Sequence, residues 1–198
     1  MPRLLLATFN RGKIEEYRSL LDGLGYEITT LAEAGITAVI TESLNSYEQN
    51  ARLKATAYAE LSGLLALADD SGLEVDALGG EPGVTSARFA GETATDADRV
   101  SLLLARLSGV PWERRTAHFK CVIAVATPEG RVETCHGECH GMIALEPKGV
   151  HGFGYDPVFF LPDQSRTMAE LPASIKNQIS HRARACQKVR QVLQQLDY

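Results

Sequence analysis

Short apolar runs alternate with amphipathic segments through the first part of the chain. Residues 3–7 and 26–30 are apolar enough to form short strands. Residues 12–21 place apolar side chains at helical spacing, and a second helix is predicted from about residue 46, where a serine can act as N-cap, to about residue 61. This alternation of strands and helices predicts an α/β fold class.

Two adjacent carboxylates stand at the end of a predicted strand. The apolar run 64–68 leads into Asp69 and Asp70 and breaks at Gly72, after which residues 73–78 alternate with a period of two, as a separate strand does. Acids placed side by side at the end of a buried strand normally recruit a cation, either a metal ion or a lysine. The alternative is a solvated turn, for which Asp, Ser and Gly are ordinary residues.

A helix beginning at Thr95 and then a hairpin are predicted next. Residues 119–126 and 131–140 flank a Pro-Glu-Gly turn, which is typical of two paired strands. The second strand carries Cys-His-Gly-Glu-Cys-His at residues 135–140. Because side chains alternate along a strand, the cysteines and the histidines would face opposite ways, so we interpret this segment as structural and not as a metal site.

The turn from Thr8 to Lys13 joins the first strand to the first helix. A helix N-terminus offers backbone N–H groups and a positive dipole end, and this turn adds a hydroxyl, an amide and two cationic side chains. The layout suits a phosphate group, although it is not a Walker loop. The alternative is a plain strand–helix connection with exposed basic residues.

Lys54 is the cation that we expect beside the two aspartates. Asn50 and Lys54 are four residues apart on the second predicted helix and therefore share a face. This helix leads through a short Ser-Gly turn into the strand that ends at the aspartates, which favours that placement. The alternative is a surface lysine whose stem covers apolar residues while its ammonium stays in water.

The last part of the chain holds a second group of candidate residues. Two glycines flank Phe153, so the backbone can approach a planar ligand and the ring can stack on it. Lys176, His181 and Arg182 lie just before and at the start of a final helix that Ser180 is predicted to cap. Cations at a helix N-terminus oppose its dipole, so we interpret Arg182 as facing an anionic or hydrogen-bonding ligand.

Composition narrows the class of protein. With 198 residues and 44% hydrophobic content, the chain can bury a sizeable core as one domain. The net charge of -5 and the lack of a long single-sign block do not predict a broad basic surface for nucleic acid. No apolar run approaches the length of a membrane span. Four scattered cysteines are interpreted as reduced thiols, and the protein as cytoplasmic.

Several separated motifs, in order along nearly the whole chain, resemble the inosine/xanthosine triphosphate pyrophosphatase family. The motifs are Thr8-x-Asn10-x-x-Lys13, Asn50-Ala51-x-x-Lys54-Ala55, Ala68-Asp69-Asp70-Ser71-Gly72-Leu73, Pro82-Gly83-Val84-x-Ser86-Ala87-Arg88, Gly152-Phe153-Gly154-Tyr155-Asp156-Pro157 and Lys176-x-x-Ile179-Ser180-His181-Arg182. The resemblance implies a single α/β domain over residues 1–198, with a long mixed β-sheet flanked by helices and two lobes around a central cleft. It also implies a homodimer.

The activity implied by the resemblance is Mg²⁺-dependent hydrolysis of non-standard purine nucleoside triphosphates (ITP, dITP and XTP) to the monophosphate and pyrophosphate. Asp70 would be the proton acceptor with Asp69 beside it, Lys54 would act with them, and Glu42 and Asp70 would bind magnesium. The substrate-binding residues implied are Thr8, Phe9, Asn10, Arg11, Gly12, Lys13, Ser71, Arg88, Phe153, Gly154, Tyr155, Asp156, Lys176, His181 and Arg182.

In this assignment, residues 8–13 and Lys54 hold the triphosphate. Residues 153–156 stack on the purine and line its site, and Lys176, His181 and Arg182 recognise its oxygens.

The sequence departs from the family pattern at two positions. Gln49 stands where the family usually has a glutamate, and Phe9 replaces a small or polar residue. Loss of the glutamate charge either weakens metal binding or removes only a supporting contact. Two other functions stay open: a related pyrophosphatase that acts on pyrimidine or modified nucleotides, and a non-catalytic nucleotide sensor. The retained acids favour an enzyme, because a pure binder gains little from carboxylates near a triphosphate.

Overall fold

The computed structural model describes residues 1–42 and 46–196. In chain order the helices and strands are β1 (Arg3–Leu6), α1 (Arg11–Leu20), β2 (Glu27–Thr30), α2 (Tyr47–Ser62), β3 (Leu65–Val75), α3 (Asp96–Arg106), β4 (Thr116–Ala126), β5 (Val132–Ile143), β6 (Phe159–Leu161), β7 (Arg166–Thr167), α4 (Ala173–Ile179) and α5 (His181–Gln195). No helix within these ranges combines the length and the apolar character that crossing a bilayer requires.

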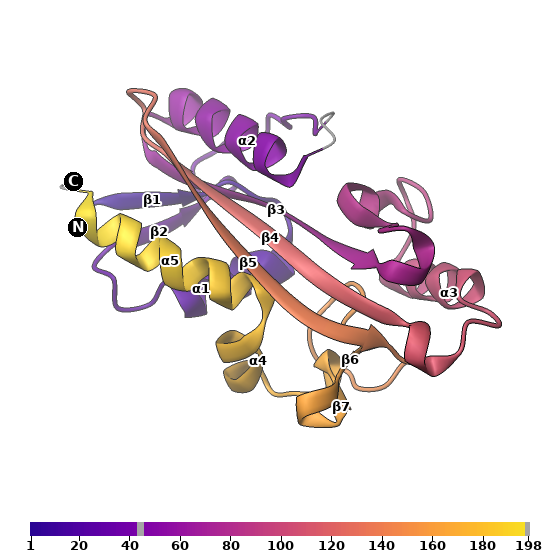
Figure 1. Ribbon diagram of the computed structural model, residues 1–198. Helices are drawn as coiled ribbons and strands as arrows, with labels where there is room; N and C mark the ends of the chain where they lie inside the picture. The colour runs from indigo at the N-terminus through magenta and orange to yellow at the C-terminus, as the bar shows by residue number, and fades with distance from the viewer. Residues whose placement is uncertain (43–45, 197–198) are drawn as a thin grey trace. The chain divides into compact units, whose positions relative to one another are not determined.

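The strands that the structure describes form one sheet in the order β2-β1-β3-β4-β5-β6-β7 (Figure 1). β1 pairs in parallel with β2 and β3, whereas β6 pairs antiparallel with β5 and β7. The predicted α/β class with a mixed sheet flanked by helices is therefore confirmed.

The chain divides into two compact units. Within the described residues, unit 1 draws on the ranges 1–70, 121–137 and 182–198, and unit 2 draws on 71–120 and 138–181. β3, β4 and β5 each pass from one unit into the other along the chain. The predicted organisation as one domain with two lobes around a cleft stays a prediction.

In unit 1, the alternation of β3 directs its side chains to two different sets of helices. Leu65 and Leu67 pack with residues of α1 and α5, whereas Ala66 and Ala68 pack with residues of α2. Helices therefore cover both faces of these strands, α1 and α5 on one and α2 on the other (Figure 1).

The expected break of the strand at Gly72 is wrong. β3 continues from Leu65 to Val75, and only Asp76–Leu78 leaves it, as a 3₁₀ helix. Leu73 continues the strand because its amide donates to Ser86 Oγ (2.9 Å) and its side chain is fully buried. A glycine weakens a strand but does not end it where neighbouring groups satisfy the backbone.

The predicted starts of α2 and α3 and the predicted hairpin are confirmed. Ser46 Oγ accepts a hydrogen bond from the backbone N–H of Gln49 (3.4 Å) and caps α2, and Thr95 opens α3 with a reciprocal capping box. β4 and β5 are joined by a turn closed from Thr127 N to Arg131 O (2.9 Å). These signals are local in sequence, which is why they could be read without the fold.

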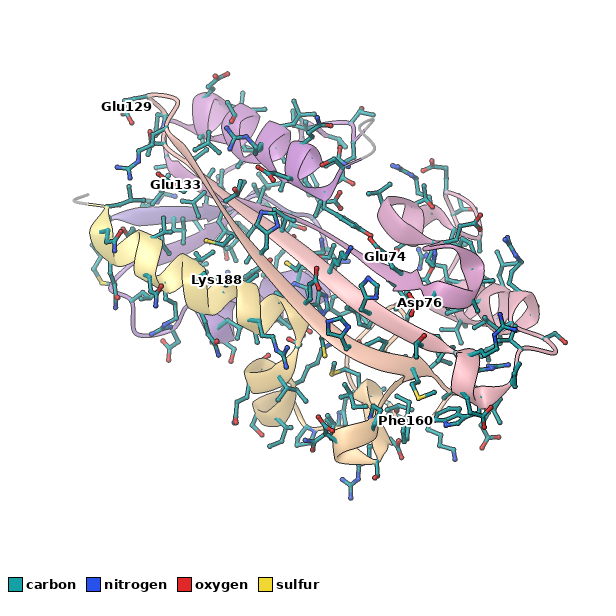
Figure 2. All side chains as sticks on the ribbon, in the orientation of Figure 1. Glu74, Asp76, Glu129, Glu133, Phe160 and Lys188 are labelled. Atoms are coloured by element: carbon teal, nitrogen blue, oxygen red, sulfur yellow. The ribbon has the colours of Figure 1, made fainter. Side chains whose placement is uncertain are left out.

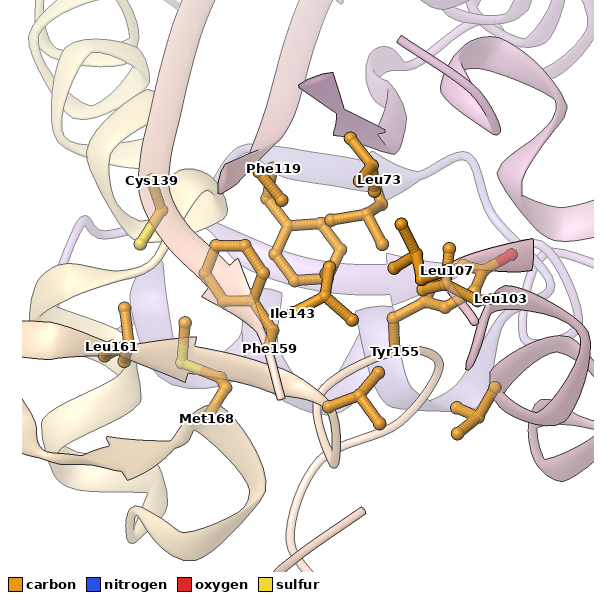
Figure 3. Packing of buried hydrophobic residues seen from close by; sticks show 14 of the residues in the cluster. Leu73, Leu103, Leu107, Phe119, Cys139, Ile143, Tyr155, Phe159, Leu161 and Met168 are labelled. Atoms are coloured by element: carbon orange, nitrogen blue, oxygen red, sulfur yellow. The ribbon is translucent and has the colours of Figure 1, made fainter. Parts of the chain in front are cut away.

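Unit 2 has its core on one side of its strands. Side chains of β3, β4, β5 and β6 meet those of α3 in a single cluster (Figure 3). The cluster includes Leu73, Leu103, Phe119, Ile143 and Phe159. Residues of α4 also pack against it, so both α-helices of this unit lie on the same side of the strands.

A buried arginine joins three segments of unit 2. Arg115 is 5% exposed, and its guanidinium donates to the carbonyl oxygens of Leu107 (2.9 Å), Val110 (3.0 Å) and Ala144 (3.2 Å). Burial lowers the pKa of this guanidinium from its ordinary value. The three carbonyl oxygens would lose their donor together if the side chain were removed.

Arg115→Met is therefore expected to lower the free energy of unfolding by about 2 kcal/mol, because buried acceptors are left unpaired. Arg114→Met is the matched control, since the neighbouring Arg114 is exposed and we expect a change within about 0.5 kcal/mol there. Chemical denaturation followed by circular dichroism measures both. Equal stability of the two variants would contradict this account of Arg115.

Candidate functional site

The two adjacent aspartates of β3 face opposite sides of the strand. Asp69 continues the row of Leu67, on the side of α1 and α5, and Asp70 continues the row of Ala68, on the side of α2. They are 1% and 5% exposed. The expectation that the carboxylates lie side by side is wrong, because it placed the end of the strand at the aspartates, whereas β3 continues through them. Each carboxylate has its own set of partners.

Asp69 is the centre of a buried charge network in unit 1. Its carboxylate pairs with Lys13 Nζ (2.9 Å) and lies 3.7 Å from the guanidinium of Arg182. Arg182, which is 2% exposed, also pairs with Glu16 on α1. Burial acts to lower the pKa of Arg182, but the charges of Glu16 and Asp69, together with Tyr17, outweigh it and raise the pKa above its usual value.

The helix dipole therefore gives only part of the reason for the position of Arg182. A cation at the start of α5 does need a negative partner, but Glu16 and Asp69 supply two within the protein itself. The contribution of Arg182 to substrate binding stays a prediction. Glu16 was missed because its partner is 166 residues away in the sequence.

Asp70 belongs to a second group, on the α2 side of β3. Asn50 Nδ2 donates to its carboxylate (2.9 Å), and the buried ammonium of Lys54 pairs with Glu42 and donates to the backbone carbonyl of Asp69. The expected position of Lys54 beside the aspartates is therefore observed. This is a lysine held in the interior and not one with its ammonium in water.

The pKa of Asp70 is raised above its ordinary value. Desolvation by burial is the largest cause, and the nearby charge of Glu42 acts in the same direction. Lys54 and the hydrogen bond from Asn50 oppose the shift without cancelling it. Asp70 is thus a carboxylate that binds a proton more readily than a solvated one, with a second carboxylate and an ammonium close by.

The Thr8–Lys13 turn leads into α1 as predicted. Asn10 is the N-cap, and its Oδ1 accepts from the backbone N–H of Lys13 (3.0 Å), while Thr8 Oγ1 accepts from that of Asn10 (3.2 Å). Part of the backbone expected to face a phosphate is thus already bonded within the turn. Phe9 and Arg11 are exposed.

A separate group lies in unit 2. Asp156 is 3% exposed; its Oδ2 accepts from the backbone N–H of Phe153 (3.0 Å) and pairs with Lys176. The ammonium of Lys176 lies 5.0 Å from the centre of the Phe153 ring, within cation–π range. Together these contacts hold the aromatic ring of the Phe153 loop next to a buried ammonium from α4.

The remaining predicted residues of unit 2 are held in different ways. The Tyr155 hydroxyl donates to Ser86 O (2.8 Å), and burial raises its pKa. The ring of His181 stacks on Phe119 with centroids 4.6 Å apart. Arg88 is exposed and pairs with Glu92 (3.9 Å), so its part in binding stays a prediction, as does that of Ser71.

The cysteine and histidine run on β5 is arranged as expected for a structural segment. Cys135 and Cys139 are buried, whereas His136 and His140 are exposed. Among residues 1–42 and 46–196, no three or more His, Cys, Asp and Glu side chains are grouped so that they could hold a metal ion by themselves. Gln49, which replaces the usual glutamate, is exposed on α2.

An α/β fold with buried ammonium and guanidinium groups beside carboxylates, next to a helix N-terminus, is typical of proteins that bind phosphate-bearing ligands. The family model of the Ham1 family matches residues 4–192, and this chain belongs to that family.

Curated relatives and a solved structure agree with this membership. A dITP/XTP pyrophosphatase of Desulforamulus reducens is 50% identical over 98% of this chain and 96% of its own length. The dITP/XTP pyrophosphatase of Bacillus subtilis is 45% identical over 98% of each chain. The structure of a HAM1 protein from Coxiella burnetii has a TM-score of 0.88 and 42% identity, covering 98% of each chain.

Proposed function

We propose that this protein is a pyrophosphatase that hydrolyses dITP, ITP and XTP to the nucleoside monophosphate and pyrophosphate. The names of the relatives support this activity. The observation that carries it here is the group on the α2 side of β3. Asp70, with its raised pKa, lies with Glu42 and the buried ammonium of Lys54. A carboxylate that accepts protons readily is suited to act as a general base toward water.

The residues of unit 1 fit an Mg²⁺ ion. Glu42 and Asp70 are carboxylates whose charges disfavour each other, and oxygen ligands of this kind, together with substrate phosphates, are what Mg²⁺ prefers. When bound, the ion would neutralise charge that develops on the phosphates. Lys13 and Lys54 would bind phosphate oxygens, and Asn50 would orient the carboxylate of Asp70.

Base recognition is proposed for the unit 2 loop. The purines of dITP and XTP carry an oxygen at position 6 where adenine carries an amino group, so a site that presents donors there leaves a polar group unpaired with ATP. Lys176 is a donor held by Asp156, and Phe153 offers a face for stacking. Guanine also has the 6-oxygen, so rejection of GTP must come from other contacts.

The test is pyrophosphate release from dITP, XTP, GTP and ATP, with and without Mg²⁺, with the nucleotide product identified. We expect metal-dependent conversion of dITP and XTP to monophosphates, with ATP nearly untouched. Binding without turnover would favour the nucleotide sensor. Turnover of pyrimidine nucleotides instead would mean that the unit 2 loop does not recognise a purine.

A pair of glycines offers a direct test of the loop. Gly152 has φ +74° and a Cβ there would lie 2.0 Å from Asp156 Oδ2, whereas Gly79, at φ +66°, would meet no heavy atom within 4 Å. Gly152→Ala is expected to displace the Asp156 carboxylate and raise KM for dITP about tenfold. Gly79→Ala shares the backbone strain without the clash, lies outside the loop and is the control. Equal KM values for both variants would contradict the loop's assigned role.

We further propose that the protein acts in the cytoplasm as a homodimer. The four cysteines are free and buried, which is typical of a reducing compartment. The support for a dimer is the face of the unit 2 strands that lies opposite the core. Both α-helices of this unit, α3 and α4, pack on the core side and so do not cover that face. Glu74 on β3 is labelled there, with Asp76 at its end (Figure 2).

Charges of both signs are interspersed on this face. Glu74 lies 3.0 Å from His118 and 2.9 Å from Lys120, and His140 lies 3.6 Å from Glu138. A surface with mixed charges can be complementary to itself about a two-fold axis. A second copy of this chain is therefore the partner that we propose for this face.

Light scattering after size exclusion tests the dimer. We expect the wild-type protein to have twice the mass of the chain and the double variant Lys120→Glu, His140→Glu to be monomeric, because both changes place like charges together. Arg52→Glu, an exposed change on α2, is the control and should stay dimeric. A monomeric wild-type protein would exclude the homodimer, and a dimeric double variant would place the interface elsewhere.

A further inference from the structure

The loop that carries Phe153 has a second attachment, from α3. The carboxylate of Asp96, at the first residue of that helix, accepts a hydrogen bond from the backbone N–H of Gly154 (2.7 Å). Asp96 and Gly154 are 58 residues apart in the sequence, so this is a tertiary contact. It acts on the residue that follows Phe153 in the chain.

The other oxygen of the same carboxylate is also bonded. Asp96 Oδ1 pairs with Arg99 (2.5 Å), and Arg99 Nε donates to the carbonyl oxygen of Ala87 (2.8 Å). Next to these atoms, the Tyr155 hydroxyl donates to Ser86 O (2.8 Å). The Asp96–Arg99 pair therefore connects the Phe153 loop, the 3₁₀ segment Gly83–Arg88 and α3.

Helix capping does not account for Asp96. Thr95 and Asp98 already form the reciprocal capping box of α3. An acid in the first turn gains some stability from the helix dipole, but that effect requires no bond to another segment, and the Asp96 side chain is 51% exposed. Both oxygens of Asp96 are instead bonded to the backbone of Gly154 and to Arg99.

We propose that Asp96 is a positioning residue for base recognition. By holding the amide of Gly154 it fixes the backbone between Phe153 and Tyr155, and so sets where the Phe153 ring stands relative to Lys176. A fixed loop binds a planar base without first being ordered, which favours affinity. This inference rests on the proposed function, because it assigns Asp96 to the base-binding part of that activity.

The experiment compares Asp96→Ala with Asp98→Ala, a change in the same helical turn that removes the capping box and leaves both bonds of Asp96 in place. For Asp96→Ala we expect KM for dITP and XTP to rise about tenfold with kcat nearly unchanged, since one charge-assisted hydrogen bond is lost. The preference for dITP over dATP should fall with it. Inhibition by inorganic tripolyphosphate, which has no base, should not change.

Asp98→Ala should lower the melting temperature and leave KM unchanged. Asp96→Asn, which keeps an acceptor for Gly154 but loses the charge that pairs with Arg99, should fall between the wild-type protein and Asp96→Ala. Unchanged KM and base preference in Asp96→Ala would overturn the inference, as would an equal rise in KM in both alanine variants. A wild-type protein that does not hydrolyse dITP or XTP would instead refute the proposed function.

Discussion

Asp70→Asn is expected to reduce the rate of dITP hydrolysis by about 10²–10⁴-fold while making the folded protein more stable. The rate falls because an amide cannot accept the proton of the attacking water. Nucleotide binding should persist, since Lys13 and Lys54 keep their charges. The change in stability has the opposite sign because the ionised Asp70 carboxylate is disfavoured in the fold.

The direction of the pKa shift gives the pH dependence of that stability. A carboxylate whose pKa is raised on folding destabilises the native state when it is ionised. Below the unfolded pKa of about 3.9, both states are protonated and the effect vanishes. It grows as pH rises from there and is complete above the raised native pKa. The stability gain of Asp70→Asn over the wild-type protein should therefore be largest at neutral pH and disappear near pH 4.

Thermal and urea unfolding in buffer with a chelator, from pH 4 to pH 8, measure this difference. Asp163→Asn is the control, because Asp163 is exposed and should change neither rate nor stability. Retention of wild-type turnover in Asp70→Asn would remove Asp70 from the mechanism. Loss of turnover accompanied by lower stability at neutral pH would show that Asp70 is a structural anion and not a base.

The sequence identified those parts of the fold whose signals are local. The Ser46 and Thr95 caps lie within three residues of their partners, and the β4–β5 hairpin is marked by its own turn. Lys54 was placed correctly because a short turn joins its helix directly to β3. In each case the interacting groups are near one another in the chain, so propensity and spacing were sufficient.

The contacts that the sequence could not supply are the long-range ones. Glu16 pairs with Arg182, 166 residues away in the sequence, and Asp96 on α3 bonds to Gly154 in a loop 58 residues away. Neither acid differs by its local context from an ordinary surface residue on a helix. The error at Gly72 had a related cause, since the hydroxyl of Ser86 that supports β3 beyond the glycine comes from a segment whose position is set by the fold.

Asp69→Asn is expected to lower the free energy of unfolding by about 3 kcal/mol, because removing one partner of a buried ion pair leaves the other uncompensated. Arg182 would lose one of its counter-charges and keep Glu16, and Lys13 would lose the carboxylate with which it pairs. The same measurements as for Asp70→Asn apply, at neutral pH and without metal.

The adjacent aspartate is the matched control for this variant. Asp69 and Asp70 lie on one strand, are both buried, and undergo the same chemical change, but they face different helices. Asp69→Asn should destabilise the protein where Asp70→Asn stabilises it. A shift of the same sign in both variants would contradict the assignment of Asp69 to a stabilising network and of Asp70 to an unfavourable ionised site. Opposite signs would show that the Asp69 carboxylate stabilises the fold, whereas the Asp70 carboxylate destabilises it and is retained for its part in hydrolysis.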